Sequence, residues 1–478
     1  MKTKVTTIKH TLTFPIVLLL APLTLCAASI DLRVVAPPKG VTTTQLVRPP
    51  KPHFNPVMYG AKADGVIYDT AALQKAIDAC AGTGGSVVLT PGRFLTKPLK
   101  LRGRMTLYFQ KGAVLLGSPK IEDYPVELPD NRASKALCRS LLYAVNADGL
   151  TIDGEGEMDG QCKVMNMPAE IRKNGTEAAR PSLLRVFRSQ NVTVKNITFR
   201  NPCMWTQIYS ECDHLLIEGV KVDAPADCAN LDGMDICDSH DVIIRNCDVR
   251  SEDDSICLKS DLPRGLKNIL IENNRIHCYR ANAIKLGSAT VGPVSHVVIR
   301  NNQISYAKYA GLNIASVDGS VVTDILVQDI EMHHVGQPVF IRLSQRRNPV
   351  GAIDGITIER VRAYETNPEN GPSCSITGIP LARIKNIRIK DCSFEMPGGM
   401  KGIPGVPAEK ENAYPQSNMF WNTPGYAFFI RHADGVVLDN VTVRRAAADD
   451  RPWLAQIDAE VKTSGCRDLG QIPFESSK

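Results

Sequence analysis

The sequence lacks the features that mark several classes of protein. Its 14 cysteines include no CxxC pair, which argues against a zinc site, and they are too scattered for a small disulfide-rich domain. Basic residues form no clustered stripe, and a net charge of +6 is small for 478 residues, so no nucleic-acid partner is expected. With 43% hydrophobic and 22% charged residues, the composition is that of an ordinary globular chain with a large core.

Long apolar runs are also scarce, and the one that stands out is at the N-terminus. Three lysines precede the apolar run Phe14–Leu25, and two alanines follow Cys26. This layout predicts a secretory signal peptide over residues 1–28, with export to the periplasm or the cell exterior. The alternative of a membrane anchor is disfavoured because the run is shorter than the roughly 20 residues of a spanning helix. Lipidation at Cys26 is a second alternative, although the preceding leucine is bulky for such a site.

What the chain does contain is a short template that recurs ten times. Apolar residues alternate with other residues, polar or small residues follow, and a second alternating pair closes the unit. Such period-2 alternation is typical of half-buried strands, and the Asn, Asp or Gly residues mark turns. The copies begin at Leu150, Val192, Leu215, Val242, Ile269, Val297, Ile325, Ile356, Ile387 and Val436. From the second to the ninth copy the steps are 23 to 31 residues, a spacing that indicates a solenoid.

These repeats predict an all-β fold, a right-handed parallel β-helix in which each repeat forms one coil around a continuous apolar core. Helical repeats are excluded because the units lack a 3.6-residue apolar face, and a two-layer sandwich fits the short, even strands less well. A solenoid needs a capped end. We expect the cap in an amphipathic helix over residues 70–81, which the sequence "GTGG" ends.

The pattern also predicts the organisation of the chain. After the signal peptide we expect a Pro-rich leader over residues 29–56, a single β-helix domain with its N-terminal cap over 57–445, and a C-terminal tail over 446–478. Gly and Pro are frequent between Pro397 and Pro424, so this stretch is expected to be an insertion that folds over one face.

Each coil holds a second short strand between two templates, and aligning these strands puts polar residues into columns. The column two residues before the strand contains Asp232, Asp254, Asn282, Ala310 and Gln337. The central, outward-facing column contains Asp235, Cys257, Lys285, Asn313 and Phe340. Because adjacent coils lie about 4.8 Å apart, the two aspartates of the first column are expected side by side.

This arrangement favours a reaction centre over a solvated turn. Carboxylates packed so closely cannot all ionise without cost, so at least one pKa is expected to rise. A protonated acid beside an ionised carboxylate is the equipment for hydrolysis of a glycosidic bond. An isolated acidic pair in a solenoid turn would instead be a turn cap. Here Asp253 enters the same patch from the turn, and Lys259, Lys285 and Arg342 lie on neighbouring rungs, whereas Glu252 is interpreted as a turn residue.

From about Tyr59 to Val443 the chain resembles the family 28 glycoside hydrolases, the polygalacturonase and rhamnogalacturonan hydrolase group. The sequence "NLDGMD" at 230–235 is similar to the family's Asn-x-Asp-Gly motif, and "EDDSICLKS" at 252–260 is similar to its Gly-Asp-Asp motif. The resemblance implies hydrolysis, with inversion, of α-glycosidic bonds in a pectin-like acidic polysaccharide or oligosaccharide, without a metal or cofactor.

The resemblance also implies the catalytic roles. Asp253 would be the general acid that protonates the leaving oxygen, and Asp232 and Asp254 would hold and activate the attacking water. An inverting acid and base lie about 6.5 to 9.5 Å apart. Neighbours in one column are too close for that separation, but Asp253 is offset at the turn and is expected to reach it.

Two family motifs are missing. "ANA" stands where the Gly-His-Gly motif is expected, so Asn282 replaces the histidine, and "NIA", which begins with Asn313, stands where Arg-Ile-Lys is expected. In polygalacturonases these basic residues hold the galacturonate carboxylate. Their loss favours a rhamnogalacturonan-type substrate, or attack from a chain end on a different uronate or a neutral sugar. The predicted substrate-binding residues are Asn230, Asp235, Lys259, Asn282, Lys285, Asn313 and Arg342.

Two other functions remain open at this point. A polysaccharide lyase on the same fold would use the clustered acids to bind calcium. A non-catalytic carbohydrate-binding β-helix would explain the missing basic residues. In each case the expected partner is a polysaccharide or oligosaccharide, and the chain is expected to be a monomer without a transmembrane segment.

Overall fold

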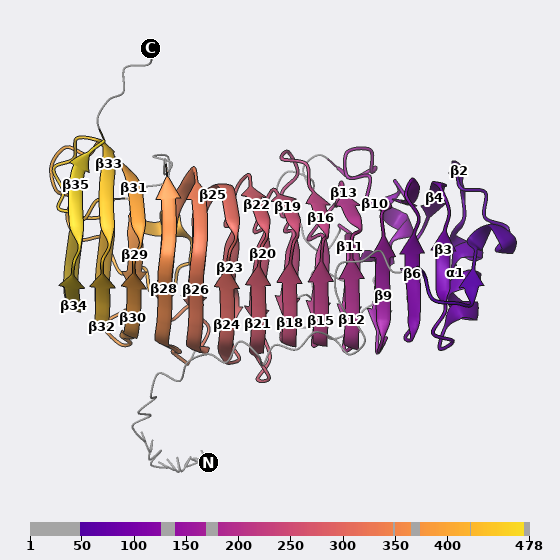
Figure 1. Cartoon of the computed structure of the whole chain (residues 1–478), viewed down its shortest axis with the longest axis horizontal. Helices are drawn as coiled ribbons and strands as arrows, with labels where there is room; N and C mark the ends of the chain where they lie inside the picture. Colours follow the sequence, from indigo (N-terminus) through magenta and orange to yellow (C-terminus); the bar gives the residue numbers. More distant parts are fainter. Residues whose placement is uncertain are drawn as a thin grey trace, which may run out of the picture.

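A computed structural model describes residues 48–125, 139–168, 180–347, 349–364, 373–420 and 422–472. In these residues the chain winds into a long parallel β-helix whose strands lie side by side along one axis (Figure 1). The predicted fold class is therefore confirmed. The predicted signal peptide and most of the leader lie outside the described residues.

The first halves of the ten sequence templates lie in one continuous sheet, which we call the template stack. Its strands pair in parallel from coil to coil, for example Val242 with Ile269 and Ile269 with Val297. The strands are β1 (His53–Phe54), β3 (Ser86–Leu89), β6 (Met105–Phe109), β9 (Leu150–Gly154), β12 (Gln190–Lys195), β15 (Asp213–Glu218), β18 (His240–Arg245), β21 (Leu266–Glu272), β24 (Val294–Arg300), β26 (Val321–His333), β28 (Ala352–Tyr364), β30 (Ile384–Lys390), β32 (Phe428–Asp439) and β34 (Leu454–Ser464).

A sharp turn leads from each template strand into a second sheet, the side stack. Asn196, Asn246, Asn273 and Asn301 make this turn with φ between 52° and 59°. Asparagine tolerates this left-handed conformation, which explains its frequent occurrence at this turn. The strands are β2 (Asp64–Tyr68), β4 (Gly92–Thr96), β7 (Ala113–Gly117), β10 (Glu157–Asp159), β13 (Thr198–Arg200), β16 (Lys221–Asp223), β19 (Asp248–Ser251), β22 (Arg275–Cys278), β25 (Gln303–Ser316), β31 (Ser393–Gly398), β33 (Thr442–Ala447) and β35 (Arg467–Gln471), joined by the ends of β26 and β28.

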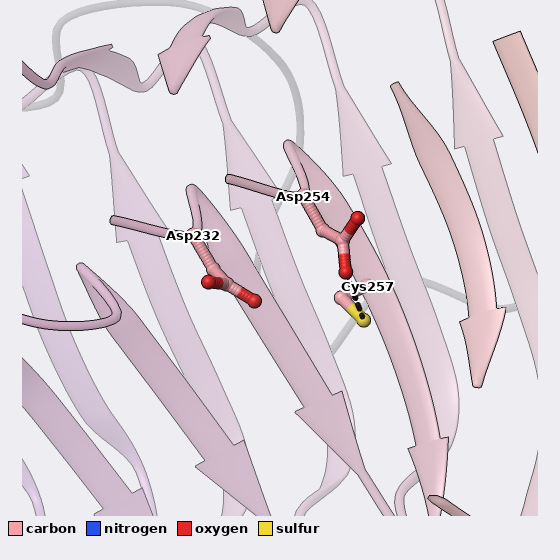
Figure 2. A group of neighbouring side chains, drawn as sticks. All are labelled: Asp232, Asp254 and Cys257. Atoms are coloured by element: carbon pink, nitrogen blue, oxygen red, sulfur yellow. Dashed lines mark hydrogen bonds between the residues drawn. The ribbon is translucent and has the colours of Figure 1, made fainter. Parts of the chain in front are cut away.

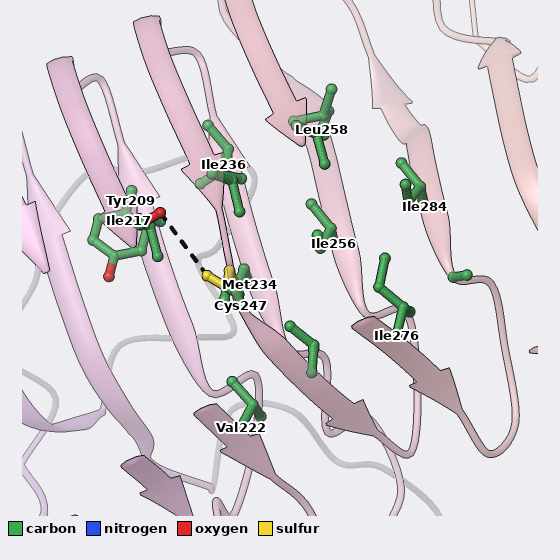
Figure 3. Close-up of a cluster of buried hydrophobic side chains, with 14 of the residues drawn as sticks. Tyr209, Ile217, Val222, Met234, Ile236, Cys247, Ile256, Leu258, Ile276 and Ile284 are labelled. Atoms are coloured by element: carbon green, nitrogen blue, oxygen red, sulfur yellow. Dashed lines mark hydrogen bonds between the residues drawn. The ribbon is translucent and has the colours of Figure 1, made fainter. Parts of the chain in front are cut away.

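The third sheet, the site stack, carries the predicted columns. Its strands are β5 (Leu99–Lys100), β8 (Ser140–Val145), β11 (Ser182–Phe187), β14 (Gln207–Ser210), β17 (Met234–Cys237), β20 (Ile256–Ser260), β23 (Ile284–Thr290), β27 (Val335–Leu343) and β29 (Cys374–Thr377), with the second half of β25 and the first half of β32. Side chains from all three stacks share one buried core, which includes Ile217 of the template stack, Val222 of the side stack and Ile236 of the site stack (Figure 3).

The N-terminal end of the core is covered as the sequence predicts. Helix α1 (Thr70–Cys80) buries Ala72, Leu73, Ala76, Ile77 and Cys80. The 3-10 helix η1 (Pro56–Tyr59) precedes it, and η2 (Ile121–Asp123) follows β7. The end of the predicted leader contributes β1, which pairs with β3 and so joins the first coil.

The C-terminal end differs from the prediction of a tail beginning at residue 446. Residues 454–471 form β34 and β35, which pair in parallel with β32 and β33 and add another coil. The solenoid thus continues past its last recognisable template. In this coil Ala455, Ile457, Ala459 and Val461 alternate with polar residues, but they are only partly buried and two of them are alanines, so the apolar pattern is weak.

Candidate active site

The strand register places the predicted columns as the sequence alignment implied. Across the rungs Asp235 pairs with Cys257, and Cys257 pairs with Lys285. The next two partners in this column are Asn313 and Phe340. A shift of this register by one residue would turn the side chains of the central column inward. The observed pairings therefore place the central column on the outside of the coil. The column is nevertheless buried, and the insertion before β32 covers it at Asn313.

Asp232 and Asp254 stand next to each other on adjacent coils (Figure 2). Their carboxylate oxygens and the thiol of Cys257 all lie within 4.8 Å of one another. Burial, together with Asp235 and Asp253, raises the pKa of Asp232 well above its ordinary value. Burial would also raise the pKa of Asp254, but Lys285 and Lys259 outweigh it and hold that pKa below its ordinary value. The two carboxyl groups of the pair therefore differ in acidity, and Asp254 loses its proton more readily than Asp232.

Asp253 lies at the turn beside this pair and is only partly buried. Its backbone carbonyl accepts a hydrogen bond from the Ser251 hydroxyl at 2.5 Å, and its Oδ1 accepts one from the Asp254 amide at 2.9 Å. Burial and the neighbouring charge of Asp254 raise the pKa of Asp253. A proton on Asp253 beside an ionised Asp254 is the division of roles that acid–base catalysis needs.

Lys259 provides charge on the N-terminal side of the pair. Its Nζ lies 3.6 Å from Asp232 Oδ2 and forms an ion pair with Asp235. It also lies 3.9 Å from the ring centre of Trp205, a cation–π contact. Burial raises the pKa of Asp235 to about 6 in spite of this ion pair. Asp235 is thus an anchor for Lys259 and does not line the pocket.

Lys285 provides charge on the opposite side. It donates hydrogen bonds to Asp254 Oδ2 at 2.7 Å and to the Tyr414 hydroxyl at 2.9 Å. Asn282 donates to Asp254 Oδ1 at 2.6 Å, and Asn313 donates to Asn282 Oδ1 at 3.3 Å. Asn282 and Asn313, both fully buried, therefore position Asp254 from behind instead of lining the pocket.

A pocket of about 270 Å³ opens over these groups. Of the predicted residues, its wall contains Asn230, Asp232, Asp253, Asp254, Lys259 and Lys285. The sequence prediction missed Trp205, Asp261, Ser288, Ala289, Arg346, Arg347 and Tyr414. The "RR" pair just after β27 was the available signal for the two arginines, whereas nothing in the pattern of the insertion marks Tyr414.

Arg346 and Arg347 give the mouth of the pocket a positive edge. Arg346 donates to Asp318 Oδ1 at 2.9 Å and to the Ser288 carbonyl at 2.9 Å, which fixes its guanidinium. Arg347 lies 4.0 Å from Asp261 and 3.8 Å from Asp318, and its side chain remains 61% exposed. This exposed guanidinium stands where a substrate carboxylate can reach it.

Arg342, like Asp235, Asn282 and Asn313, is a predicted substrate-binding residue that lies outside the pocket wall. It is completely buried and does not line the pocket. Its guanidinium donates to the carbonyl groups of Gly378 at 3.1 Å and Glu409 at 2.7 Å. Phe420, in the 3-10 helix η6 (Ser417–Phe420), packs on it with its ring centre 5.3 Å away. The predicted substrate contact of Arg342 remains a prediction; in this structure the insertion covers that rung and contacts the guanidinium.

The acidic cluster is a poor fit to calcium. Lys259 Nζ lies 3.0 Å from Cys257 Sγ, and Lys285 Nζ lies 2.7 Å from Asp254 Oδ2, so two ammonium groups contact the atoms that a cation would need. Burial also raises the pKa of the Cys257 thiol well above its ordinary value. Calcium prefers six to eight oxygen ligands and no competing cations. The donor set thus gives no support to a calcium-dependent lyase.

Comparisons with known proteins agree with this geometry. Residues 128–366 match the sequence profile of the glycosyl hydrolases family 28. The chain is 26% identical over 360 residues to a polygalacturonase of Chamaecyparis obtusa, covering 69% of this chain and 66% of that one. It is 27% identical over 404 residues to an exo-poly-alpha-D-galacturonosidase of Dickeya chrysanthemi, covering 71% and 66%. The match thus spans just under two thirds of each relative.

A solved structure supports the fold. The exopolygalacturonase of Thermotoga maritima superposes with a TM-score of 0.62 at 22% identity, covering 73% of this chain and 88% of that one. No helix in the described part of the chain is long and apolar enough to cross a membrane.

Proposed function

Because the chain belongs to family 28 of the glycosyl hydrolases, we propose that it cleaves α-glycosidic bonds of a pectin-like acidic polysaccharide or oligosaccharide by hydrolysis with inversion. One observation carries the proposal. Asp253, whose pKa is raised, and Asp254, whose pKa is lowered, share one pocket with an exposed arginine at its mouth.

The chemistry follows from these two protonation states. Asp253 gives its proton to the leaving glycosidic oxygen as the bond to the anomeric carbon breaks. A water molecule attacks that carbon from the opposite face and loses its proton to Asp254, which is ionised at rest. Asp232 Oδ1 is buried and accepts no hydrogen bond from the described residues, so it can help to hold this water. Attack from the opposite face inverts the anomeric configuration.

The substrate is proposed to carry a uronate. Lys285 and Arg347 lie in the pocket wall, and they replace the charge of the missing histidine and Arg-Ile-Lys motifs. A guanidinium binds a carboxylate with two parallel hydrogen bonds, so the exposed Arg347 is the stronger candidate for this contact.

Attack is proposed to begin at a chain end. Beyond Lys285 the insertion blocks the site stack, since Asn313 donates to the Pro415 carbonyl at 3.2 Å and Gln337 donates to the Ser417 carbonyl at 3.0 Å. A substrate that reaches the acids therefore meets a closed wall at this side. The names of the Dickeya and Thermotoga relatives, which are exo-acting, point the same way.

Asp253→Asn is the direct test. We expect kcat on oligogalacturonides or rhamnogalacturonan fragments to fall by a factor of about 10² to 10⁴, because the general acid is lost, with little change in KM. Glu252→Gln, in the same acidic triplet, is the matched control and should change kcat only slightly. The product anomer observed by NMR immediately after cleavage should be inverted. Full turnover by Asp253→Asn would refute the assignment, and an unsaturated product detected by its ultraviolet absorbance would indicate a lyase.

We also propose that the protein is exported through its N-terminal 28 residues. Their lysines, apolar run and small residues support this, as described above. N-terminal sequencing of the mature protein from the periplasm or culture fluid should begin near residue 29. A mature chain that retains Met1 would contradict export by this signal.

A further inference from the structure

A second hollow lies on the side stack, around the corner from the active site. It encloses about 550 Å³, and its wall includes Asp248 and Arg250 of β19, Arg275 and His277 of β22, and Tyr279 just beyond that strand. None of these residues takes part in the chemistry described above.

The charge in this hollow is positive and only partly neutralised. Asp223 precedes Arg250 by one coil in the same column. Its carboxylate already accepts a 2.6 Å hydrogen bond from Arg200. No acidic partner contacts Arg250 among the described residues. Arg275 pairs with Asp248 at 2.9 Å but keeps 71% of its side chain exposed. The ion pairs of this column thus end with that of Arg200 and Asp223. The guanidinium of Arg250 is left available for an anion.

Aromatic rings form the adjoining wall. His277 and Tyr279 meet edge to face with ring centres 4.6 Å apart, and Tyr306 of β25 stacks behind His277 at 5.4 Å. Rings fixed in this way offer an apolar surface with polar edges at little cost in side-chain entropy. Such a surface suits a pyranose ring, which presents C–H groups on its face and hydroxyl groups at its rim.

The hydrogen bonds of His277 determine which of its two ring nitrogens carries the proton. Ser305 donates its hydroxyl proton to the Ile276 carbonyl at 3.2 Å, so its oxygen is left to accept from His277 Nδ1 at 3.0 Å. Burial and the nearby Arg250 lower the pKa of His277, which keeps the ring neutral. Nε2 then carries a lone pair, and in the described part of the chain no group donates to it. It is an acceptor for a sugar hydroxyl.

We propose that this hollow is a second carbohydrate-binding site, which takes one or two uronate residues of a polymeric substrate. Arg250 and Arg275 would bind the carboxylate, the ring of His277 or Tyr279 would cover the sugar face, and His277 Nε2 would accept a hydroxyl proton. The choice of a uronate rests on the proposed function.

The position of the hollow suggests what it contributes. Only four residues separate Ser251, the last residue of β19, from Ile256, the first residue of the catalytic strand β20, and Asp253 is one of them. Arg280, next to Tyr279, donates to Glu252 at 3.0 Å. A polymer held at the hollow would therefore stay close to the acids between cleavage events, which raises its effective concentration there.

Binding to a catalytically silenced chain tests the proposal. In an Asp253→Asn background, Arg250→Ala should weaken the affinity for polygalacturonate about tenfold through loss of a charge-assisted contact, and Tyr279→Ala should weaken it as well. Arg362→Ala is the matched control, because this exposed arginine lies in the same stack two coils beyond Gln303. In the active chain, KM for a disaccharide or trisaccharide substrate should be the same for Arg250→Ala and Arg362→Ala.

Histidine NMR gives a readout that does not depend on turnover. Addition of polygalacturonate should shift the His277 imidazole signals, identified by their loss in His277→Gln, and a neutral polymer of similar length should not shift them. Equal polymer affinity in Arg250→Ala and Arg362→Ala, or an unmoved His277 signal, would overturn the second site while leaving hydrolysis intact. A moved His277 signal in a chain that hydrolyses no uronate would instead leave the site standing and refute the proposed function.

Discussion

At the residue scale, the site depends on which carboxyl group each lysine contacts. Lys259 lies between Asp232 and Asp235, whereas Lys285 contacts Asp254 alone among the acids. All of these groups are buried. In such surroundings a paired lysine stabilises the ionised carboxylate, and at Asp254 the two lysines outweigh burial, whereas at Asp232 and Asp235 burial outweighs Lys259.

Lys285→Met should therefore move the pH profile of kcat/KM upward. The acid limb reflects protonation of Asp254, whose pKa Lys285 lowers, and the alkaline limb reflects ionisation of Asp253, whose pKa Lys285 also lowers. Without the cation both pKa values rise, and we expect both limbs to shift by about one pH unit or more. Lys267→Met, which removes an exposed lysine of β21, should leave the limbs in place. If the two limbs of the pH profile do not move in Lys285→Met, groups other than Asp253 and Asp254 control the pH dependence.

At the element scale, the insertion before β32 completes the pocket and also hides part of the site stack. Tyr414 reaches Lys285, and Arg342 holds the carbonyl group of Glu409. The column register was predictable from the sequence because apolar alternation with period 2 fixes which residues face outward. The path of the insertion was not, since it lacks periodicity and its position depends on contacts with distant rungs. The same reason explains why the sequence did not predict that the insertion covers Arg342.

Arg342→Met should loosen this insertion. Methionine keeps much of the packing against Phe420 but leaves buried backbone acceptors without a donor, which costs about 1–3 kcal/mol. Relief of the repulsion from Arg431, which together with burial lowers the pKa of Arg342 to about 10, offsets part of this cost. Urea unfolding should show reduced stability, and limited proteolysis should cut within residues 399–420. Arg388→Met, on the outer face of β30, should have little effect on either. Unchanged stability with a raised KM would restore Arg342 as a substrate contact.

At the scale of the whole molecule, stability spreads along the solenoid because each coil packs mainly on its two neighbours. The ten templates predicted this architecture, since their inward residues must bury a shared core. They did not predict the last coil. Phe428 pairs with Leu454 and Asp439 with Ser464, yet the alternating apolar residues of β34 are only partly buried and include two alanines, so they match the template weakly.

Removal of residues 448–478 should consequently destabilise the folded chain, whereas removal of a tail outside the solenoid would leave its stability unchanged. The truncation would leave β32 and β33 with unpaired edges and would uncover Phe428, Ile430 and Val436, which are fully buried in the intact chain. Open parallel edges over an exposed core promote association between chains. We expect oligomers by light scattering after size exclusion and a lower Tm, whereas removal of residues 473–478 alone should preserve the elution and Tm of the full chain. A truncated protein with the same mass distribution and Tm as the full chain would show that the solenoid is complete at β33.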